Sequence, residues 1–135
     1  MKVLLIRPFY HLAKFQCPTY IIERKVVSMG LSDKVEFTDQ LYGSDLIRAY
    51  NSADVFVYIS LYENFGQTIL EAAAAGLPII STPVGVTKDI IVNGKTGFLM
   101  SFHNPEELSE KIMLLIQDRE LRERFRNIKK FVAEK

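Results

Sequence analysis

Two carboxylates, Glu63 and Glu71, lie on either side of an aromatic–glycine pair, Phe65-Gly66, with seven residues between them. Residues 54–60, ahead of this pair, are rich in β-branched and aromatic residues and predict a strand. A helix is predicted over residues 66–75. Glycine has no Cβ, so the backbone at Gly66 can approach a ligand closely. One acid therefore precedes a glycine turn, and the other lies in the second turn of the helix.

The backbone amides of Gly66, Gln67 and Thr68 lie at the predicted start of this helix, where N–H groups have no partner within the helix. Such a position favours an anion, for example a phosphate. Carboxylates repel a phosphate, but an ionised carboxylate accepts hydroxyl donors well. Each charge-assisted hydrogen bond contributes about 1.5–3 kcal/mol and the helix dipole only about 0.3–1 kcal/mol, so the acids would contribute more selectivity. The pattern predicts a ligand with hydroxyls on both sides of a phosphate, which is the layout of a nucleotide-sugar.

The spacing alone leaves a simpler interpretation open, in which Glu63 is a surface loop acid and Glu71 a solvated helix residue. His11 and His103 are isolated, and Cys17 is the single cysteine, so we expect surface or structural roles for these three residues. The sequence has no metal-ligand spacing. We expect neither a metal nor a cofactor, only a nucleotide-sugar as substrate.

Short apolar strands alternate with helices along the chain, which predicts a parallel sheet with right-handed crossovers. The predicted fold class is α/β, a three-layer Rossmann-like sheet with helices on both faces. Ligands of such sheets bind outside the carboxyl ends of the strands, where residues 61–66 fall. The predicted strands are 3–6, 34–38 (nearer the sheet edge), 54–60, 77–82 and 97–100, and residues 8–18 are predicted to form a loop. Helices are predicted over residues 19–29 and 66–75, and another is predicted to be capped by Ser44 and to run to residue 51. Two more are predicted near the C-terminus. The first starts at Asn104-Pro105, and the second starts at Asp118 with Leu121, Phe125, Ile128 and Val132 on one face.

The composition suits one globular domain over residues 1–135, because 48% of the 135 residues are hydrophobic and the net charge is only +1. This charge gives no reason to expect nucleic acid or an anionic membrane as the main partner. No apolar run approaches the roughly 20 residues that span a bilayer, so no transmembrane segment is expected. Arg7 and Pro8 interrupt the N-terminal run, which indicates a strand and not a signal peptide. With a single cysteine, the expected location is cytoplasmic.

The segment over residues 50–100 resembles the donor-binding domain of group 1 glycosyltransferases, which have the GT-B fold of two Rossmann-like domains. Glu63 and Glu71 fit the E-x7-E signature of that family, and the string from "YNSADVFVYIS" to "NGKTGFLM" matches around them. The final helix pair and "SDKVEFTDQL" extend a looser similarity over most of the chain.

The resemblance implies a glycosyltransferase of the hexosyltransferase type, which transfers a sugar from a nucleotide-sugar with retention and without a metal. Glu63 would be the catalytic residue and would hold the donor sugar together with the backbone of residues 64–66. The diphosphate would meet residues 66–68, Glu71 would bind the ribose hydroxyls, and residues 40 and 41 would lie near the base. The donor-binding residues implied are Asn64, Phe65, Gly66, Gln67, Thr68, Glu71, Gln40 and Leu41.

The chain departs from the family pattern at three positions near this segment. Ile59 stands where a proline is usual, Val86 where a second glycine is common, and Asp89 where a glutamate is common. The last two changes affect the loop after residues 77–82 and bear on the geometry of the donor there.

Over residues 1–135 we expect no counterpart of the N-terminal acceptor domain of the family or of the first strand–helix unit of the donor domain. The absent strand would lie mid-sheet, so the remaining strands are expected to close the gap or to leave an exposed edge, which favours a homodimer. Transfer needs a closed cleft, so we expect an acceptor-binding domain or subunit as partner and little activity from this chain alone. The alternatives are a fragment, a truncated gene product, one subunit of a split enzyme, or a non-catalytic module that binds a nucleotide or a protein.

Overall fold

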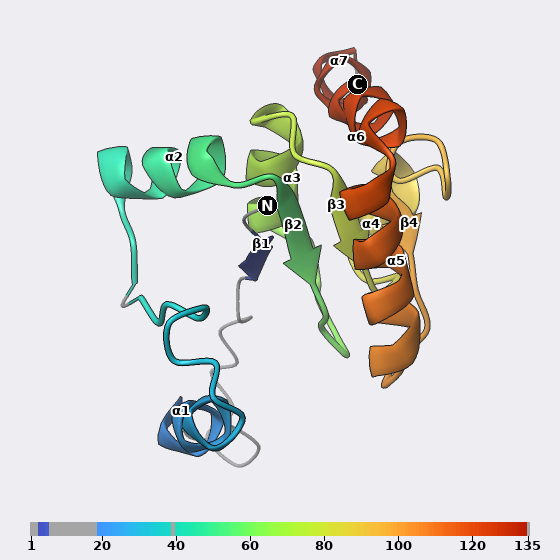
Figure 1. The fold of residues 1–135 in the computed structure, drawn as a ribbon. Helices are drawn as coiled ribbons and strands as arrows, with labels where there is room; N and C mark the ends of the chain where they lie inside the picture. Colours follow the sequence, from blue (N-terminus) through green and yellow to red (C-terminus); the bar gives the residue numbers. More distant parts are fainter. Residues whose placement is uncertain (1–2, 6–18, 39, 135) are drawn as a thin grey trace.

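The computed structural model describes residues 3–5, 19–38 and 40–134, which form an α/β fold around a parallel sheet (Figure 1). The four strands of this sheet lie in the order β1-β2-β3-β4. They are β1 (Val3–Leu5), β2 (Val55–Tyr58), β3 (Ile79–Ser81) and β4 (Phe98–Leu99). The helices are α1 (Thr19–Ser28), α2 (Gly43–Ser52), α3 (Gln67–Ala74), α4 (Thr87–Ile90), α5 (Pro105–Gln117), α6 (Arg119–Arg126) and α7 (Ile128–Ala133).

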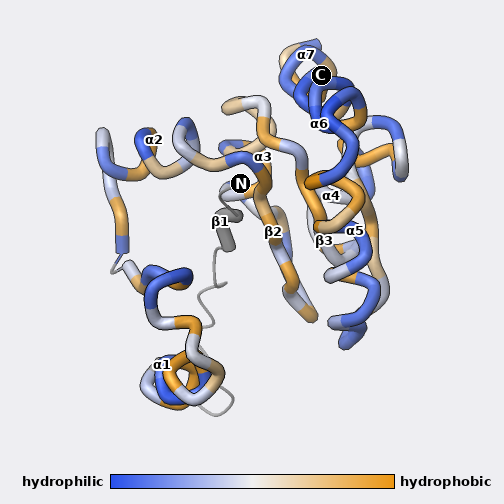
Figure 2. Tube along the Cα trace, viewed as in Figure 1, coloured by the Kyte–Doolittle hydropathy of each residue, from blue (hydrophilic) through white to orange (hydrophobic). Residues whose placement is uncertain are grey.

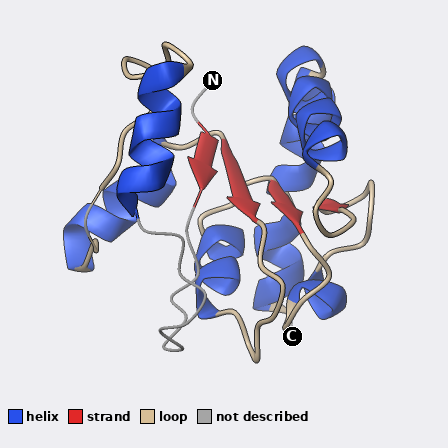
Figure 3. Ribbon diagram, turned by 90° about the horizontal axis from the view of Figure 1, so that it is seen from below, coloured by secondary structure: helices blue, strands red, loops and turns tan. Residues whose placement is uncertain are grey.

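Helices cover both faces of the sheet, which confirms the predicted three layers (Figure 3). All four residues of β2 are buried, and they alternate between two core clusters. Phe56 and Tyr58 pack with α2, α3, α4 and α7 in the first cluster, whereas Val55 and Val57 pack with α5 and α6 in the second. A strand buried on both faces needs a continuous apolar run, and for that reason β2 was recognisable in the sequence.

Strand β1 lies directly beside β2 and pairs with it in parallel, with Val3 opposite Val55 and Leu5 opposite Val57. Among the described residues no strand lies between β1 and β2, so the two are direct neighbours in the sheet. Among the described residues, β1 pairs with a strand on one side only and forms an edge of the sheet. The strand prediction for residues 3–6 is confirmed over residues 3–5. Residue 6 and the loop predicted for 8–18, which includes His11 and Cys17, lie outside the described residues.

The strand predicted at residues 34–38 is wrong, because Lys34 ends a turn and residues 35–38 have no regular secondary structure. Val35 and Phe37 are 39% and 42% exposed. Alternation of apolar and polar residues produces a strand only where a neighbouring strand supplies the hydrogen-bond ladder. The predicted cap at Ser44 is also wrong, since α2 begins one residue earlier, at Gly43, and its N-cap is Tyr42 without a side-chain cap.

The prediction of one helix from Asp118, with four apolar residues on one face of it, is wrong, because the chain forms two helices there, α6 and α7. Leu121 and Phe125 belong to the second core cluster, whereas Ile128 and Val132 pack in or against the first. The chain changes face at Asn127, whose N–H donates to the carbonyl of Arg124 three residues back and separates α6 from α7. The start of α6 is as predicted, because the Asp118 side chain accepts a hydrogen bond from the Leu121 N–H.

Helix α1 stands apart from the sheet in Figure 1, and Figure 2 shows apolar residues along it. Its Tyr20 and Val27, and Met29 directly after it, are among the large hydrophobic residues that remain exposed. None of its described residues belongs to either core cluster. The helix prediction is confirmed, but the helix does not take part in the core.

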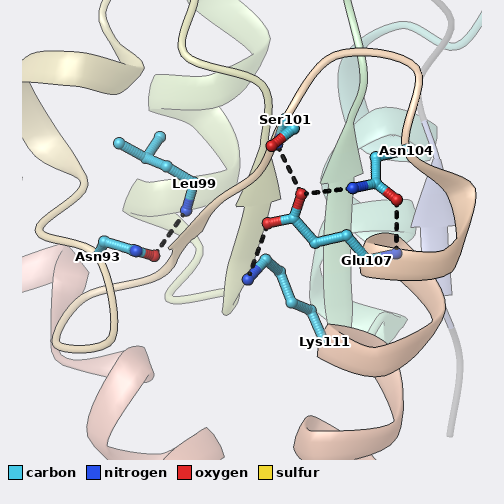
Figure 4. A network of polar contacts seen from close by, with 6 residues as sticks. All are labelled: Asn93, Leu99, Ser101, Asn104, Glu107 and Lys111. Carbon is cyan, nitrogen blue, oxygen red and sulfur yellow. Dashed lines mark hydrogen bonds and ion pairs between the residues drawn. The ribbon is translucent and has the colours of Figure 1, made fainter.

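The N-terminus of α5 is held by a network of polar contacts around Glu107 (Figure 4). The Asn104 side chain caps the helix by accepting from the Glu107 N–H, with Pro105 in the first turn, as predicted. The Glu107 carboxylate accepts hydrogen bonds from the Ser101 N–H at 2.9 Å and the Asn104 side-chain amide at 3.2 Å. It also forms an ion pair of 3.2 Å with Lys111, and nearby the Asn93 side chain accepts from the Leu99 N–H of β4. These contacts attach the start of α5 to the chain that follows β4.

We expect Glu107→Gln to destabilise the fold at neutral pH and to have no effect in strong acid. The hydrogen bond from Ser101, aided by Lys111, lowers the pKa of Glu107 below its usual value, although burial opposes this. The stabilisation is therefore present above the unfolded-state pKa and is lost as the pH falls through the lower folded-state pKa. Urea unfolding at several pH values measures this difference. Glu110→Gln, at an exposed position of the same helix, is the matched control and should show no such pH dependence.

Candidate functional site

The first carboxylate, Glu63, lies in the loop between β2 and α3 and is held by two donors. The Tyr58 hydroxyl, at the end of β2, donates to Glu63 Oε2 at 2.5 Å. The backbone N–H of Phe65 donates to Glu63 Oε1 at 3.3 Å. Glu63 is half-buried, and these two donors restrict the orientation of its carboxylate.

The loop that carries Glu63 rests on the loop that follows β3. The Val86 N–H donates to the Phe65 carbonyl at 2.8 Å. Gly85 has φ +49°, and a Cβ at this position would lie 2.6 Å from the Phe65 carbonyl oxygen and 3.0 Å from Glu63 Cγ. Only glycine permits this approach. Val86 departs from the family pattern in its side chain, but its contact with the Phe65 loop uses the backbone.

The N-terminus of α3 follows immediately and carries no side-chain cap. Gly66 is the N-cap in the left-handed conformation, with φ +91°. The first intrahelical bond of α3 runs from the Ile69 N–H to the Gly66 carbonyl at 3.0 Å. The N–H groups of Gln67 and Thr68 precede that bond, and such amides at a helix start form a favourable site for an anion.

The second carboxylate, Glu71, lies in the second turn of α3 and faces α2. The Tyr50 hydroxyl donates to Glu71 Oε2 at 2.9 Å, and the Gln67 side-chain amide donates to Oε1 at 3.3 Å. Burial raises the pKa of the Tyr50 hydroxyl well above its usual value, and the hydrogen bond to Glu71 and its negative charge add to this effect. Tyr50 therefore stays protonated and remains a donor to Glu71.

Glu71 also lines a hollow of about 480 Å³ between α2 and α3. Leu46, Ile47 and Tyr50 of α2 form one wall, and Ala74 and Ala75 form the other. A second hollow, of about 350 Å³, opens at the carboxyl ends of β2, β3 and β4. There Thr82 joins two strand ends, since its hydroxyl donates to the Ser60 carbonyl at 2.6 Å and accepts from the Ser60 N–H at 3.1 Å.

The structure thus places residues 63–71 on one continuous loop–helix segment that follows β2. Asn64 is exposed in the turn and accepts a hydrogen bond from the Tyr62 hydroxyl, and Phe65 is exposed as well. Gln40 and Leu41 precede α2, and in the described part of the chain no hydrogen bond joins them to residues 63–71. Gly43, two residues after Leu41, nevertheless lines the same hollow as Glu71.

The sequence reasoning missed the two tyrosines that hold the carboxylates. A buried tyrosine hydroxyl normally finds a hydrogen-bond partner, so Tyr58 in a buried strand and Tyr50 in an amphipathic helix were a usable signal. In the described residues there is no group of three or more His, Cys, Asp or Glu side chains that would hold a metal ion. None of the helices in these same ranges is both long enough and apolar enough to cross a membrane.

The fold and this arrangement define a Rossmann-like domain of the kind that forms one half of GT-B glycosyltransferases. Residues 20–131 match the family described as glycosyl transferases group 1, and the chain belongs to this family. Sulfoquinovosyl transferase SQD2 of Arabidopsis thaliana is 43% identical over 90 residues, which are 64% of this chain and 18% of that protein.

Solved structures with a similar fold include the following two. The C-terminal domain of the glycosyl transferase group 1 family protein LpcC from Francisella tularensis aligns with a TM-score of 0.76 and 28% identity, over 86% of this chain and 60% of that chain. Anabaena HepE, solved in complex with UDP-glucose, aligns with a TM-score of 0.80 and 22% identity, over 91% of this chain and 34% of that chain. The chain spans between 18% and 30% of the length of the curated relatives that it matches.

Proposed function

We propose that this chain binds the nucleotide-sugar donor of a retaining glycosyltransferase. The observation that carries the proposal is the pair of carboxylates, Glu63 and Glu71, on either side of the uncapped N-terminus of α3. Membership of the group 1 family supports sugar transfer. HepE shares the fold and was solved with UDP-glucose, which makes this donor one of those to test.

Each end of the nucleotide-sugar donor can bind one of the two carboxylates in residues 63–71. A carboxylate has about four lone-pair sites. Tyr50 and Gln67 donate to Glu71, one on each oxygen, which leaves about two sites for the two hydroxyls of a ribose. Tyr58 and the Phe65 N–H donate to Glu63 in the same way, and its remaining sites accept hydroxyls of the donor sugar. The diphosphate then binds between the two acids, at the amides of residues 66–68.

In the transfer, the bond from the anomeric carbon of the sugar to the diphosphate oxygen breaks, and the nucleoside diphosphate leaves with the electron pair. A new bond forms to a hydroxyl oxygen of the acceptor, on the same face of the sugar, and the hydroxyl proton passes to the leaving diphosphate oxygen. The role of this chain is to position the donor and to stabilise the charge on the leaving diphosphate with the N–H groups of α3. Glu63, in contact with the sugar, is the proposed catalytic residue. The base lies toward Gln40 and Leu41, which precede the α2 wall of the hollow beside Glu71.

Transfer needs donor and acceptor in a closed cleft, so the proposal includes an acceptor-binding domain or a separate subunit. Among the described residues β1 has a strand on one side only, and its other edge can receive a strand from such a companion or from a second copy of the chain. Light scattering of the purified chain distinguishes a dimer from a monomer. We expect little or no transfer activity from this chain alone.

Calorimetric titration with UDP, GDP, ADP and their sugar conjugates is expected to show binding of one nucleotide series. Glu71→Ala should weaken this binding by roughly 10- to 150-fold, because it removes charge-assisted hydrogen bonds worth about 1.5–3 kcal/mol. Glu110→Ala, an exposed acid on α5, is the matched control and should bind like the wild type. If the folded wild-type chain binds none of these compounds, this chain does not hold a donor pocket by itself, and a non-catalytic interaction module becomes the better hypothesis.

A further inference from the structure

Three aromatic rings form a continuous column through the first core cluster. Tyr50 comes from α2, and Phe56 and Tyr58 come from β2. The ring centroids of Tyr50 and Phe56 lie 6.0 Å apart, and those of Phe56 and Tyr58 lie 6.2 Å apart. All three side chains are buried, with at most 4% of their surface exposed. Their positions are therefore fixed by close packing.

Each end of this column carries a hydroxyl that meets one of the two acids. Tyr58 donates to Glu63 at 2.5 Å, and Tyr50 donates to Glu71 at 2.9 Å. Tyr50 also lies 3.3 Å from the Thr68 carbonyl, in the first turn of α3. Phe56, the middle ring, has no polar group, whereas the hydroxyls of Tyr50 and Tyr58 each lie beside one of the two carboxylates.

We propose that Tyr50 and Tyr58 are positioning residues, which hold Glu71 and Glu63 in the orientation and separation that the ligand requires. This inference rests on the proposed function and deepens it. The column acts as a rigid spacer, because moving one phenol requires the packed neighbour to move as well. Glu63 lies in a loop and Glu71 on a helix surface, and each carboxylate would otherwise sample several rotamers.

The chemistry explains why the end residues are tyrosine and the middle one is phenylalanine. Burying a hydroxyl without a partner costs free energy, so a tyrosine at these positions is useful only when its hydroxyl is bonded. A phenol that donates to a carboxylate occupies one lone pair, and because a second donor meets the other oxygen, about two lone-pair sites remain for the ligand. Orientation before binding lowers the entropy lost on binding, which raises affinity without any contact between tyrosine and ligand.

The two tyrosines should affect different parts of the ligand, because they hold different acids. Tyr58 acts through Glu63 on the sugar, so Tyr58→Phe should weaken binding of the nucleotide-sugar but not of the nucleoside diphosphate. Tyr50 acts through Glu71 on the ribose, so Tyr50→Phe should weaken binding of both. A general loss of structure would weaken both ligands in both variants and would not produce this difference.

Calorimetry on the full chain with a nucleotide-sugar and the matching nucleoside diphosphate tests this prediction. We expect a weakening of about tenfold in the affected combinations, equal to about 1.4 kcal/mol. Tyr20→Phe, on α1, is the matched control and should bind both ligands as the wild type does. Thermal unfolding verifies that each variant is folded. If both phenylalanine variants bind both ligands with wild-type affinity while Glu71→Ala does not, the positioning role is refuted and the proposed function stands.

A second measurement needs no ligand. Glu71 helps to raise the pKa of Tyr50, so Glu71→Gln should lower the pKa of this phenol toward its usual value in a ¹³C nuclear magnetic resonance titration. Burial keeps part of the upward shift in the variant. An unchanged Tyr50 titration would refute the coupling whether or not a nucleotide binds. Absence of nucleotide binding by a folded wild type would instead refute the proposed function, and the ligand-positioning role with it.

Discussion

Gly85→Ala is expected to lower the free energy of unfolding by about 2–4 kcal/mol and to remove most of the affinity for the donor. Gly85 has φ +49°, a conformation that costs a residue with a Cβ about 1–2 kcal/mol. The new Cβ would also lie 2.6 Å from the Phe65 carbonyl oxygen. This oxygen cannot retreat freely, because it accepts the hydrogen bond from the Val86 N–H. The clash must therefore displace the loop that carries Glu63.

Gly94→Ala separates the effect of backbone strain from that of the contact. Gly94 also has a positive φ, +76°, but a Cβ there would meet no atom within 4 Å. We expect this variant to lose only the strain energy of about 1–2 kcal/mol and to keep its affinity for the nucleotide. Urea unfolding and calorimetry on the two variants make the comparison. Equal losses in stability and unchanged binding in both would show that the two loops do not depend on each other.

The parts of the fold that could be predicted from the sequence are those whose structure depends on residues close by in the sequence. The β2 run is apolar on both faces, the Asn104-Pro105 start carries its own cap, and the glycine turn before α3 follows from local chemistry. Residues 34–38 have an equally regular alternation, but whether they form a strand depends on a partner elsewhere in the chain. The pattern of one segment does not contain that information, so the strand prediction failed there.

The C-terminal helices show a related limit. Leu121, Phe125, Ile128 and Val132 have helical spacing, and the spacing correctly indicates that all four are buried or partly buried. It does not show which side of the sheet buries them. The single break at Asn127 transfers the chain from one core cluster to the other, and a stripe of apolar residues looks the same before and after such a crossing.

The site divides in the same way. Residues 63–71 are contiguous, so the sequence was enough to place both acids beside the start of one helix. The groups that hold these acids come from other elements: Tyr50 from α2, and the loop at Gly85 from beyond β3. A buried tyrosine hydroxyl is expected to have a hydrogen-bond partner, but only the folded chain shows that the partner of the Tyr50 hydroxyl is Glu71.

Phe125→Ala is expected to have the largest effect on stability, a loss of about 3–5 kcal/mol in the free energy of unfolding. Phe125 is fully buried in the second core cluster, where its ring meets that of Phe98 edge-on at 4.9 Å between centroids. It connects α6 to the sheet, and truncation leaves a cavity there. Domains of this kind are stable by only about 5–15 kcal/mol, so the variant would lose a large share of the total.

Because Phe125 lies on the face of the sheet opposite the Tyr50–Tyr58 column, the donor affinity of the folded variant should stay near that of the wild type. Urea unfolding measures the stability, and calorimetry at low temperature measures the affinity. Phe102→Ala is the matched control, since Phe102 is 43% exposed and should cost about 0.5 kcal/mol or less. A loss at Phe125 as small as that at Phe102 would contradict the docking of α6 on the sheet. A large loss of affinity in folded Phe125→Ala would mean that the two faces are coupled, and that the packing beneath β2 also sets the positions of the two acids.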